Sequence, residues 1–371
     1  FRRPVAFPSV IAAAMKRLVL LGGGHAHLFV LEAFAREQPE AVVSLITPDA
    51  LTPYSGMMPG VIAGHYDYRQ ACIDLAPLAA RAGCALRLDA AVSLDAAQRQ
   101  IRLASGEVID YDLLSIDTGS TPRIPDLPGA DTCGHPVKPI GQLLDSWHTA
   151  RAARSAAVVG AGAAGVEIIM ALHHRQPRMR CTLVDRAPCL LDGLPVRLQR
   201  RVIAELVRQR IEVVTDARVS GIDGDALRLE DGRSIPSQFT VWATGAAPPA
   251  WLRGSGLALD ERGFIATGPT LQSLSHPEVF AAGDVATMID APRPKSGVFA
   301  VRAGPPLAAN LLRAARRDTL QPWTPQTRAL LLLACGRRHA IASRGGWSLQ
   351  GDWVWRWKDR IDRAFMRRFD L

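Results

Sequence analysis

The sequence contains no run of about 18 apolar residues, the minimum for a helix that crosses a membrane. Only six cysteines occur among its 371 residues, which argues against a disulfide framework and predicts a reducing, cytoplasmic location. Aromatic residues make up 6%, and no aromatic–basic motif for reading bases is present. We therefore expect no nucleic acid partner, although the net charge is +9 and comes mainly from arginine.

A glycine-rich turn between an apolar strand and a helix is the first motif with chemical meaning. Gly22, Gly23 and Gly24 follow the apolar run LVLL, and a helix begins near His25 and Ala26. Glycine lets the backbone turn tightly and approach a ligand, and the free N–H groups at the start of the helix attract a pyrophosphate. This arrangement is typical of a dinucleotide-binding βαβ unit.

Two positions depart from the usual dinucleotide pattern GxGxxG. His27 replaces the third glycine, and Thr47 stands where an acid normally follows the second strand, with Asp49 two residues later. That acid usually binds the ribose hydroxyls. Thr47 therefore argues against a nicotinamide dinucleotide at this first site and leaves FAD open.

A second copy of the motif is complete. Gly160, Gly162 and Gly165 follow the apolar strand AAVV and precede a helix-like segment. The next strand ends in Asp185, at the distance expected for an acid that binds ribose hydroxyls and favours NADH over NADPH. Its neighbour Arg186 keeps NADPH open as an alternative donor.

Both halves of the chain repeat one plan. After each glycine motif, short segments with turn residues predict an antiparallel β-meander. Each meander leads into a buried strand that ends in a Thr-Gly pair, Thr118 and Gly119 in the first half and Thr244 and Gly245 in the second. We therefore predict an α/β protein with two Rossmann-like dinucleotide-binding domains, each with a meander insert.

The first of these domains is expected to be discontinuous in sequence. The predicted boundaries are 15–125 and 239–320 for the first domain, 126–238 for the second, and 321–371 for a small C-terminal region. The segment before Lys16 resembles a signal peptide superficially, but we interpret it as an upstream extension. Leu51 to Tyr66, rich in glycine, proline and methionine, fits neither a helix nor a strand period and is predicted to be a loop over a ligand.

The order of the motifs resembles that of the pyridine nucleotide–disulfide oxidoreductase superfamily. The match runs from about Lys16 to Ala315 and includes Gly283 and Asp284 in the later segment AAGDV. The resemblance implies that the first unit holds FAD, that the second holds NADH or NADPH, and that Asp284 contacts the flavin ribitol. Hydride would pass from NADH to FAD, and electrons would then pass to a second acceptor.

Within the superfamily the chain resembles type II NADH dehydrogenases, which implies a quinone as the acceptor. The segments GGGHAHLFVLE, LTPYSGMMPG and PKSGVFAVRAGPPLAANL resemble reductases found beside, or fused to, selenophosphate synthetase. The type II resemblance places Glu167 near the nicotinamide; an acid that only stabilises a helix start is the alternative. Lys295, in the PKSG segment, is expected to stabilise the reduced flavin, with a solvated lysine as the alternative.

The cysteine spacing argues against reduction of disulfides. Members of the superfamily that reduce disulfides carry C-x4-C or C-x-x-C, and the six cysteines here have neither spacing. Sulfide:quinone reductases, which the PKSG segment also resembles, need cysteines near the flavin. Cys133 and Cys335 are the candidates, although LLLLACG is more typical of a core strand. His25 and His27 face different sides of a helix, so no metal is expected.

The last 21 residues predict a basic amphipathic helix. Trp357, Ile361, Phe365 and Phe369 recur every four residues, and arginines occupy the other faces. Such a helix suits peripheral contact with the inner face of an anionic membrane. Packing on its own domain or on a partner in a homodimer is the alternative.

Two other functions stay open at this point. One is a soluble reductase that passes electrons to a small redox protein. The other is a flavoprotein that acts as an NADH-responsive binding module rather than as an enzyme. The identity of the electron acceptor distinguishes the soluble reductase from a quinone reductase. Measurable turnover distinguishes an enzyme from the binding module.

Overall fold

The computed structural model describes residues 15–370; the extension predicted before that range lies outside it. The first domain is built on a parallel five-stranded sheet in the order β21-β9-β1-β2-β5. Its strands are β1 (Lys16–Leu21), β2 (Ala41–Thr47), β5 (Cys84–Leu88), β9 (Leu113–Ile116) and β21 (Val279–Ala281). The strand β21 comes from late in the chain, so this domain is discontinuous, as predicted.

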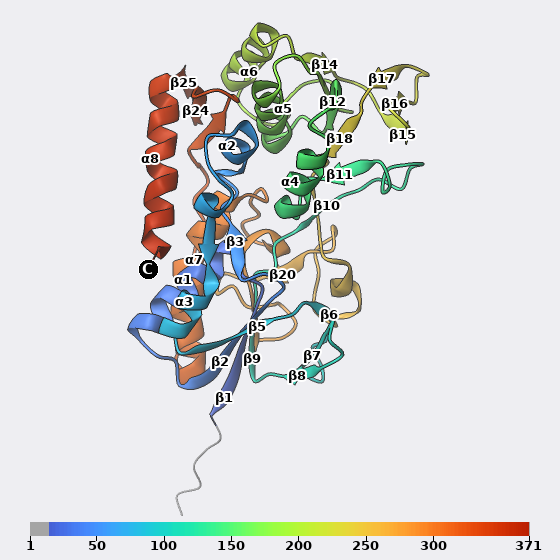
Figure 1. The fold of residues 1–371 in the computed structure, drawn as a ribbon. Helices are drawn as coiled ribbons and strands as arrows, with labels where there is room; N and C mark the ends of the chain where they lie inside the picture. The colour runs from blue at the N-terminus through green and yellow to red at the C-terminus, as the bar shows by residue number, and fades with distance from the viewer. Residues whose placement is uncertain (1–14, 371) are drawn as a thin grey trace, which may run out of the picture.

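Helices and a meander cover opposite faces of this sheet (Figure 1). The helical layer consists of α1 (His25–Arg36), α3 (Leu75–Arg81) and α7 (Gly297–Arg316). The meander consists of β6 (Ala91–Asp95), β7 (Gln100–Leu103) and β8 (Val108–Asp110). Leu28, Leu31 and Phe34 of α1 are fully buried against the sheet, because apolar residues three and four positions apart share one face of a helix.

The second domain repeats the parallel sheet in the order β11-β18-β12-β13-β14. Its strands are β11 (Gly134–Pro136), β12 (Ser155–Val159), β13 (Arg180–Val184), β14 (Glu212–Val214) and β18 (Phe239–Trp242). The helices are α4 (Ile140–Thr149), α5 (Ala163–Arg175) and α6 (Val196–Arg208). The second meander consists of β15 (Val219–Asp223), β16 (Ala226–Leu229) and β17 (Ser234–Pro236), so both predicted meanders are present.

Two details differ from the predictions. The strand β18 pairs with β12 inside the second sheet, so the chain returns to the first domain after Trp242 and not at residue 239. The predicted loop over Leu51–Tyr66 contains β3 (Leu51–Pro53), which pairs with β4 (Cys72–Asp74), and the short helix α2 (Met58–Ala63). Neither element has enough residues to show a period in the sequence.

A small C-terminal region joins the two domains. The antiparallel strands β23 (Leu331–Ala334), β24 (Ala340–Arg344) and β25 (Trp347–Gly351) lead into α8 (Asp352–Phe369). Figure 1 shows α8 as a long helix that runs from the level of α5 and α6 down to α1 and α3. Within residues 15–370, no helix combines the length and apolar character that a membrane crossing requires.

Candidate functional site

The first glycine turn folds closely over the end of β9. The φ of Gly22 is +95°, and a Cβ there would lie 2.5 Å from the Asp117 carbonyl oxygen. Gly22 N donates to the Ile46 carbonyl at 2.8 Å, and Gly24 N donates to the Asp117 carbonyl at 3.1 Å. The N–H groups of Gly23 and His25 have no acceptor among residues 15–370, which leaves them for a ligand.

Asp117 caps the helix that follows this turn. Its Oδ2 accepts hydrogen bonds from the N–H groups of Ala26 (2.7 Å) and His27 (3.1 Å), since the cap residue Gly24 has no side chain. Burial raises the pKa of Asp117 to about 7, and the two N–H donors partly oppose that rise. No sequence motif points to Asp117, because the motif at this position ends in the Thr-Gly pair and assigns no role to the residue before it.

His27, which departs from the glycine pattern, holds the turn from inside. It is fully buried; its Nδ1 donates to the Gly22 carbonyl oxygen at 2.6 Å, which leaves Nε2 to accept from the Ser115 hydroxyl at 2.8 Å. Burial lowers its pKa to about 4, so the ring is neutral at pH 7. Thr47, at the end of β2, is also buried, and its hydroxyl donates to the Asp49 carbonyl at 3.3 Å.

Asp284 joins the two domains. It follows β21 in a short 3-10 helix, η3 (Gly283–Val285), and Oδ2 lies 3.0 Å from the ammonium of Lys138 and 3.4 Å from the hydroxyl of Ser120. Lys138 lies two residues before α4 of the second domain, whereas Ser120 follows β9 of the first. Gly283 packs against Asp117, because a Cβ there would lie 2.4 Å from Oδ1 of that side chain. No sequence motif points to Lys138 or Ser120.

The second glycine turn has the geometry that its complete motif predicts. The φ of Gly160 is +109°, and a Cβ on Gly165 would lie 1.8 Å from the Gly160 carbonyl oxygen. A Cβ on Gly162 would meet nothing within 4 Å, so this side of the turn is open. Gly245 and Gly119, which end the matching strands, also have positive φ (+86° and +71°) and open space beside them.

Asp185 faces this turn from the end of β13. Its Oδ2 accepts from the N–H of Ala161, between the first two glycines, and its Oδ1 accepts from the N–H of Ala187 at 2.8 Å. The carboxylate is therefore fixed in place beside the turn. Arg186 is exposed and has no carboxylate partner among the described residues.

Half-buried Glu167 and two buried side chains of α8 form a polar cluster between the two domains. Oε1 of Glu167 accepts from the N–H of Ala334 at 2.8 Å. Burial raises the pKa of Glu167 to about 7, while the nearby Lys358 lowers it. Lys358 pairs with Asp362 at 2.7 Å and donates to the Gly56 carbonyl at 2.5 Å, with 9% and 5% of the two side chains exposed. First domain, second domain and C-terminal helix thus meet at this cluster.

Residues 16–304 match the family model of the pyridine nucleotide-disulphide oxidoreductases. The chain belongs to this family. It is therefore an oxidoreductase that uses FAD and NAD(P)H, and the fold agrees with two dinucleotide-binding domains.

Curated relatives and solved structures fit this membership. NADH dehydrogenase-like protein YutJ of Bacillus subtilis (strain 168) is 25% identical over 287 residues, covering 75% of this chain and 79% of that protein. The biphenyl dioxygenase system ferredoxin–NAD(+) reductase component of Paraburkholderia xenovorans (strain LB400) is 31% identical over 283 residues, covering 72% and 67%. The sulfide:quinone oxidoreductase of Aquifex aeolicus superposes with a TM-score of 0.80 over 95% of this chain and 91% of that one; at 18% identity it shows the fold alone.

The first glycine turn of this family member fits the pyrophosphate and ribityl chain of FAD. Two free N–H groups at the start of α1 would bind the pyrophosphate. Thr118 is exposed beside the turn, and Gly119 leaves open space. Nε2 of His25 is enclosed without a hydrogen-bond partner in the described part of the chain, and burial lowers its pKa to about 4. An unpartnered buried nitrogen is typical of a site that a ligand completes.

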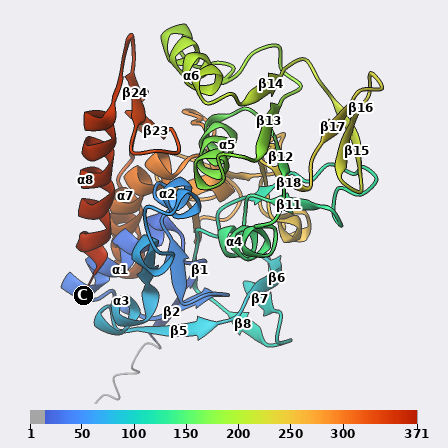
Figure 2. The ribbon, with the colours of Figure 1, turned by 45° about the horizontal axis from the view of Figure 1, so that its top comes forward.

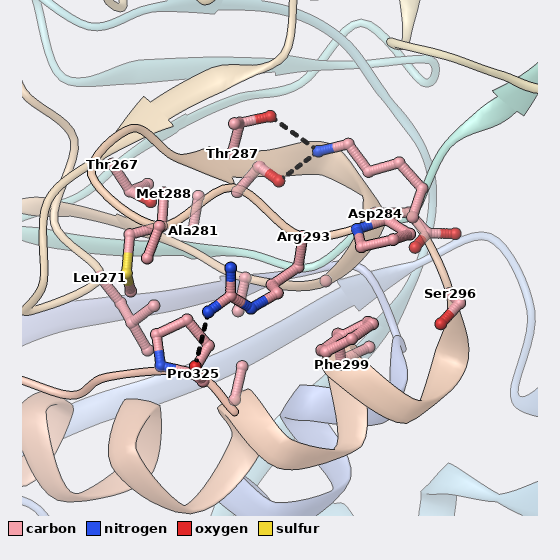
Figure 3. Close-up of a pocket in the computed structure, with 18 of the residues that line it drawn as sticks. Thr267, Leu271, Ala281, Asp284, Thr287, Met288, Arg293, Ser296, Phe299 and Pro325 are labelled. Carbon is pink, nitrogen blue, oxygen red and sulfur yellow. Dashed lines mark hydrogen bonds between the residues drawn. The ribbon is translucent and has the colours of Figure 1, made fainter. Parts of the chain in front are cut away.

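Asp284, Thr287 and Phe299 line a small cavity of about 60 Å³ (Figure 3). Lys295 also lies on the wall of this cavity. Its ammonium donates to the Ala286 carbonyl and, at 2.9 Å, to the Thr287 hydroxyl, and it lies 4.1 Å from the centre of the Phe264 ring. Burial lowers its pKa to about 8. The ammonium is thus directed toward β22 (Ala286–Met288), and a role beside the flavin stays a prediction.

The inward face of α8 differs from the predicted stripe. Phe369 is buried and Phe365 stacks on Tyr54 at 4.5 Å, as an apolar stripe predicts. Ile361, however, is 38% exposed, and the inward face carries Lys358 and Asp362 instead. Charged residues four positions apart look like a solvated pair in the sequence, which is why this face was missed.

Lysine is rare in this family member. Of the 44 basic side chains only four are lysines: Lys16, Lys138, Lys295 and Lys358. Lys16 donates to the Ala314 and Ala315 carbonyls at the end of α7, at 2.8 and 2.9 Å. The other three are the lysines described above, each with at least two oxygen atoms within 3.4 Å of its ammonium.

The cysteines form no pair. All six are free; Cys335 is fully buried in the core that the C-terminal region shares with the second domain, and Cys133 is exposed. Burial raises the pKa of Cys335, which disfavours a reactive thiolate. Among residues 15–370, no group of three His, Cys, Asp or Glu side chains is placed to hold a metal ion.

Proposed function

We propose that the protein oxidises NADH through FAD and passes the electrons to a quinone at a membrane surface. The observation that carries this proposal is the two-sided character of α8. Its inner side reaches the first glycine turn, because Phe365 stacks on Tyr54 and the ring of His25 lies 6.0 Å from Phe365 and 5.6 Å from Tyr54. Its outer side exposes Trp353 (49%) and Ile361 (38%). One helix therefore contacts both the redox site and the surroundings of the protein.

The outer face of the C-terminal region suits the headgroup layer of a membrane. Trp347 and Leu349 of β25 are 39% and 42% exposed and precede the exposed apolar side chains of α8. Arg356, Arg360 and Arg367 of α8 are exposed beside them. Tryptophan favours the membrane interface, and arginine favours anionic lipids. A quinone is itself an apolar molecule dissolved in the membrane, so its reductase gains from contact with that surface.

The glycine turns and their acids take the binding roles in this proposal. Gly160, Gly162 and Gly165 admit the pyrophosphate of NADH, and Asp185 binds the adenosine ribose hydroxyls. Gly22, Gly23, Gly24, His25 and Ala26 face the pyrophosphate of FAD, with Thr47 and Thr118 beside it. Asp284 binds the ribitol, and Lys138 and Ser120 fix its orientation.

Glu167 supplies an acid–base group in the same proposal. Reduction of a quinone to a quinol consumes two protons, and a carboxyl with a pKa near 7 can hold and release a proton at neutral pH. Lys358 and Asp362 fix the surroundings of that carboxyl. Lys295 contributes positive charge from the neighbouring cavity wall.

An anaerobic titration with NADH tests the redox part of the proposal. We expect NADH to bleach the flavin absorbance and a ubiquinone analogue to restore it rapidly. Bleaching by NADH without rapid recovery on addition of the quinone would refute the assignment of a quinone as the electron acceptor. A purified protein that takes up no FAD would refute the assignment of the first glycine turn.

Vesicle binding tests the membrane part separately. Removal of all of α8 would also remove Lys358 and Phe369 from the core, so point variants are preferable. Trp353→Ser with Ile361→Ser should abolish binding to anionic vesicles while reduction of a soluble acceptor stays unchanged. Leu274→Ser is the matched control, because Leu274 is 58% exposed elsewhere on the surface. Equal loss of vesicle binding in the Leu274→Ser control would refute the assignment of this face of α8 as the membrane-binding surface.

A reductase of a small redox protein is the second candidate, favoured by the 31% identity with a ferredoxin–NAD(+) reductase component. The net charge of +9 suits an acidic protein acceptor. Faster reoxidation by a ferredoxin than by a quinone would establish this alternative. The association with selenophosphate synthetase stays a prediction, and so does a homodimer, which light scattering would detect.

A further inference from the structure

A second cavity lies away from both glycine turns. It has a volume of about 460 Å³, within the range of small-ligand sites, and is formed where α5 and α6 end, where β13 begins, and at the turn between β23 and β24. Figure 2 shows these elements gathered at one side of the second domain. The helix α5 begins at the second glycine turn, and its 13 residues span about 20 Å, so this cavity is separate from the dinucleotide site.

Positive charge converges on this cavity from separate parts of the chain. Five arginines line it: Arg178, Arg180, Arg208, Arg210 and Arg337. Arg180 pairs with Glu212 at 3.1 Å, and Arg208 pairs with Glu205. The remaining three have no carboxylate partner among residues 15–370, which leaves three positive charges around one cavity.

The helix dipoles offset only part of this positive charge. The C-terminal ends of α5 and α6 both face the cavity, and each helix end carries about half a negative charge. Together they offset about one positive charge, so about two remain. An anion bound in the cavity would offset the rest, and a guanidinium group binds phosphate through two parallel hydrogen bonds.

The other lining residues add hydrogen bonding and apolar surface. Burial lowers the pKa values of His173 and His174, so both rings are neutral at pH 7 and add no charge. Nδ1 of His173 is enclosed with no hydrogen-bond partner in the described part of the chain. Met179, which is buried, and Pro177 provide apolar surface on the same wall. A ligand that is partly ionic and partly flat or apolar fits this combination.

We propose that this cavity binds a small polyanion with adjacent phosphate groups. Arg178, Arg210 and Arg337 bind the phosphates, and the imidazole rings and Met179 contact the rest of the molecule. A nucleoside triphosphate and an inorganic polyphosphate share this chemistry. The proposal is independent of the electron acceptor, because the cavity lies outside the redox site.

Titration of the FAD-loaded protein with tripolyphosphate and with ATP tests the proposal. Calorimetry is performed in about 150 mM NaCl, which screens diffuse attraction, and with saturating NAD+, which fills the second glycine turn. We expect saturable binding that the double variant Arg178→Gln/Arg337→Gln weakens at least about tenfold, since each lost charged hydrogen bond lowers affinity by that order. Arg337→Gln alone should weaken it partially. Reduction of the flavin by NADH should stay unchanged in both variants.

Arg200→Gln is the matched control, because Arg200 is an exposed arginine of α6 that does not line the cavity. It should bind tripolyphosphate as the unmodified protein does. Tighter binding of ATP than of tripolyphosphate would identify a nucleotide as the ligand; equal binding would identify the phosphate chain. Absence of saturable binding by both probes, or equal weakening in the Arg200→Gln control, would overturn the proposal.

Discussion

Replacement of Glu167 by glutamine tests whether the carboxyl beside α8 changes its protonation near neutral pH. Burial raises the pKa of Glu167 from 4.5 to about 7. Because the folded-state pKa lies above the unfolded value, the stability linked to this proton is fully present below about pH 4.5 and is lost as the pH rises through 7. At 1.36 kcal/mol per pKa unit, the whole interval corresponds to about 3 kcal/mol.

The glutamine variant removes the titration but keeps the local hydrogen bond. Its side-chain oxygen can still accept from the N–H of Ala334, which Oε1 of Glu167 now binds. The free energy of unfolding is measured by urea titration at pH 5 and at pH 8 for both proteins. From the two pKa values we expect the free-energy difference between variant and unmodified protein to move by about 2 to 3 kcal/mol in favour of the variant between these pH values.

Other titrating groups do not obscure the comparison. Burial also raises the pKa of Asp117 to about 7, but Asp117 is present in both proteins, so its contribution cancels in the difference. The same free-energy difference at pH 5 and pH 8 would refute the assigned protonation of Glu167. It would also remove the basis for Glu167 as an acid–base group in the proposed function.

Three further sets of variants examine the rest of the site. Gly165→Ala places a Cβ 1.8 Å from a carbonyl oxygen of the second glycine turn, so it should lower the thermal unfolding temperature, whereas Gly162→Ala should keep the unfolding temperature and weaken only NADH binding. Lys358→Met leaves Asp362 buried without its partner and should cost about 3–5 kcal/mol of unfolding free energy; the double variant with Asp362→Leu should recover most of that loss. Asp185→Ala should raise the KM for NADH about tenfold without changing the flavin spectrum, because a charged hydrogen bond contributes about 1.5–3 kcal/mol.

The sequence predicts those features whose signals are local. Both glycine turns lie where the motifs place them, because a tight turn after an apolar strand requires glycine within a few residues. Both meanders were predicted from alternating residues and turn positions. The end of the second domain was set too early, because a strand that ends in a Thr-Gly pair can belong to either sheet, and only the pairing of Phe239–Trp242 with β12 decides it.

Features that depend on distant partners were not predictable. His27 and Asp117 stand 90 positions apart, yet together they replace the missing third glycine and the missing cap of α1. Neither residue alone indicates that role. No role was predicted for Lys358 or Asp362, because the pattern of the helix does not show that Gly56 and Glu167 lie opposite them.

Because lysine is scarce, covalent labelling of amines is confined to a few defined positions of this protein. Reagents that acylate amines ignore guanidinium groups, so among 44 basic side chains they have only four lysines to modify. Three of these four, Lys138, Lys295 and Lys358, hold polar contacts around the region where the two domains and α8 meet. The extent of acylation at each, followed by mass spectrometry, therefore reports how strongly its contacts protect the amine in solution. Most proteins carry too many surface lysines for such a direct footprint.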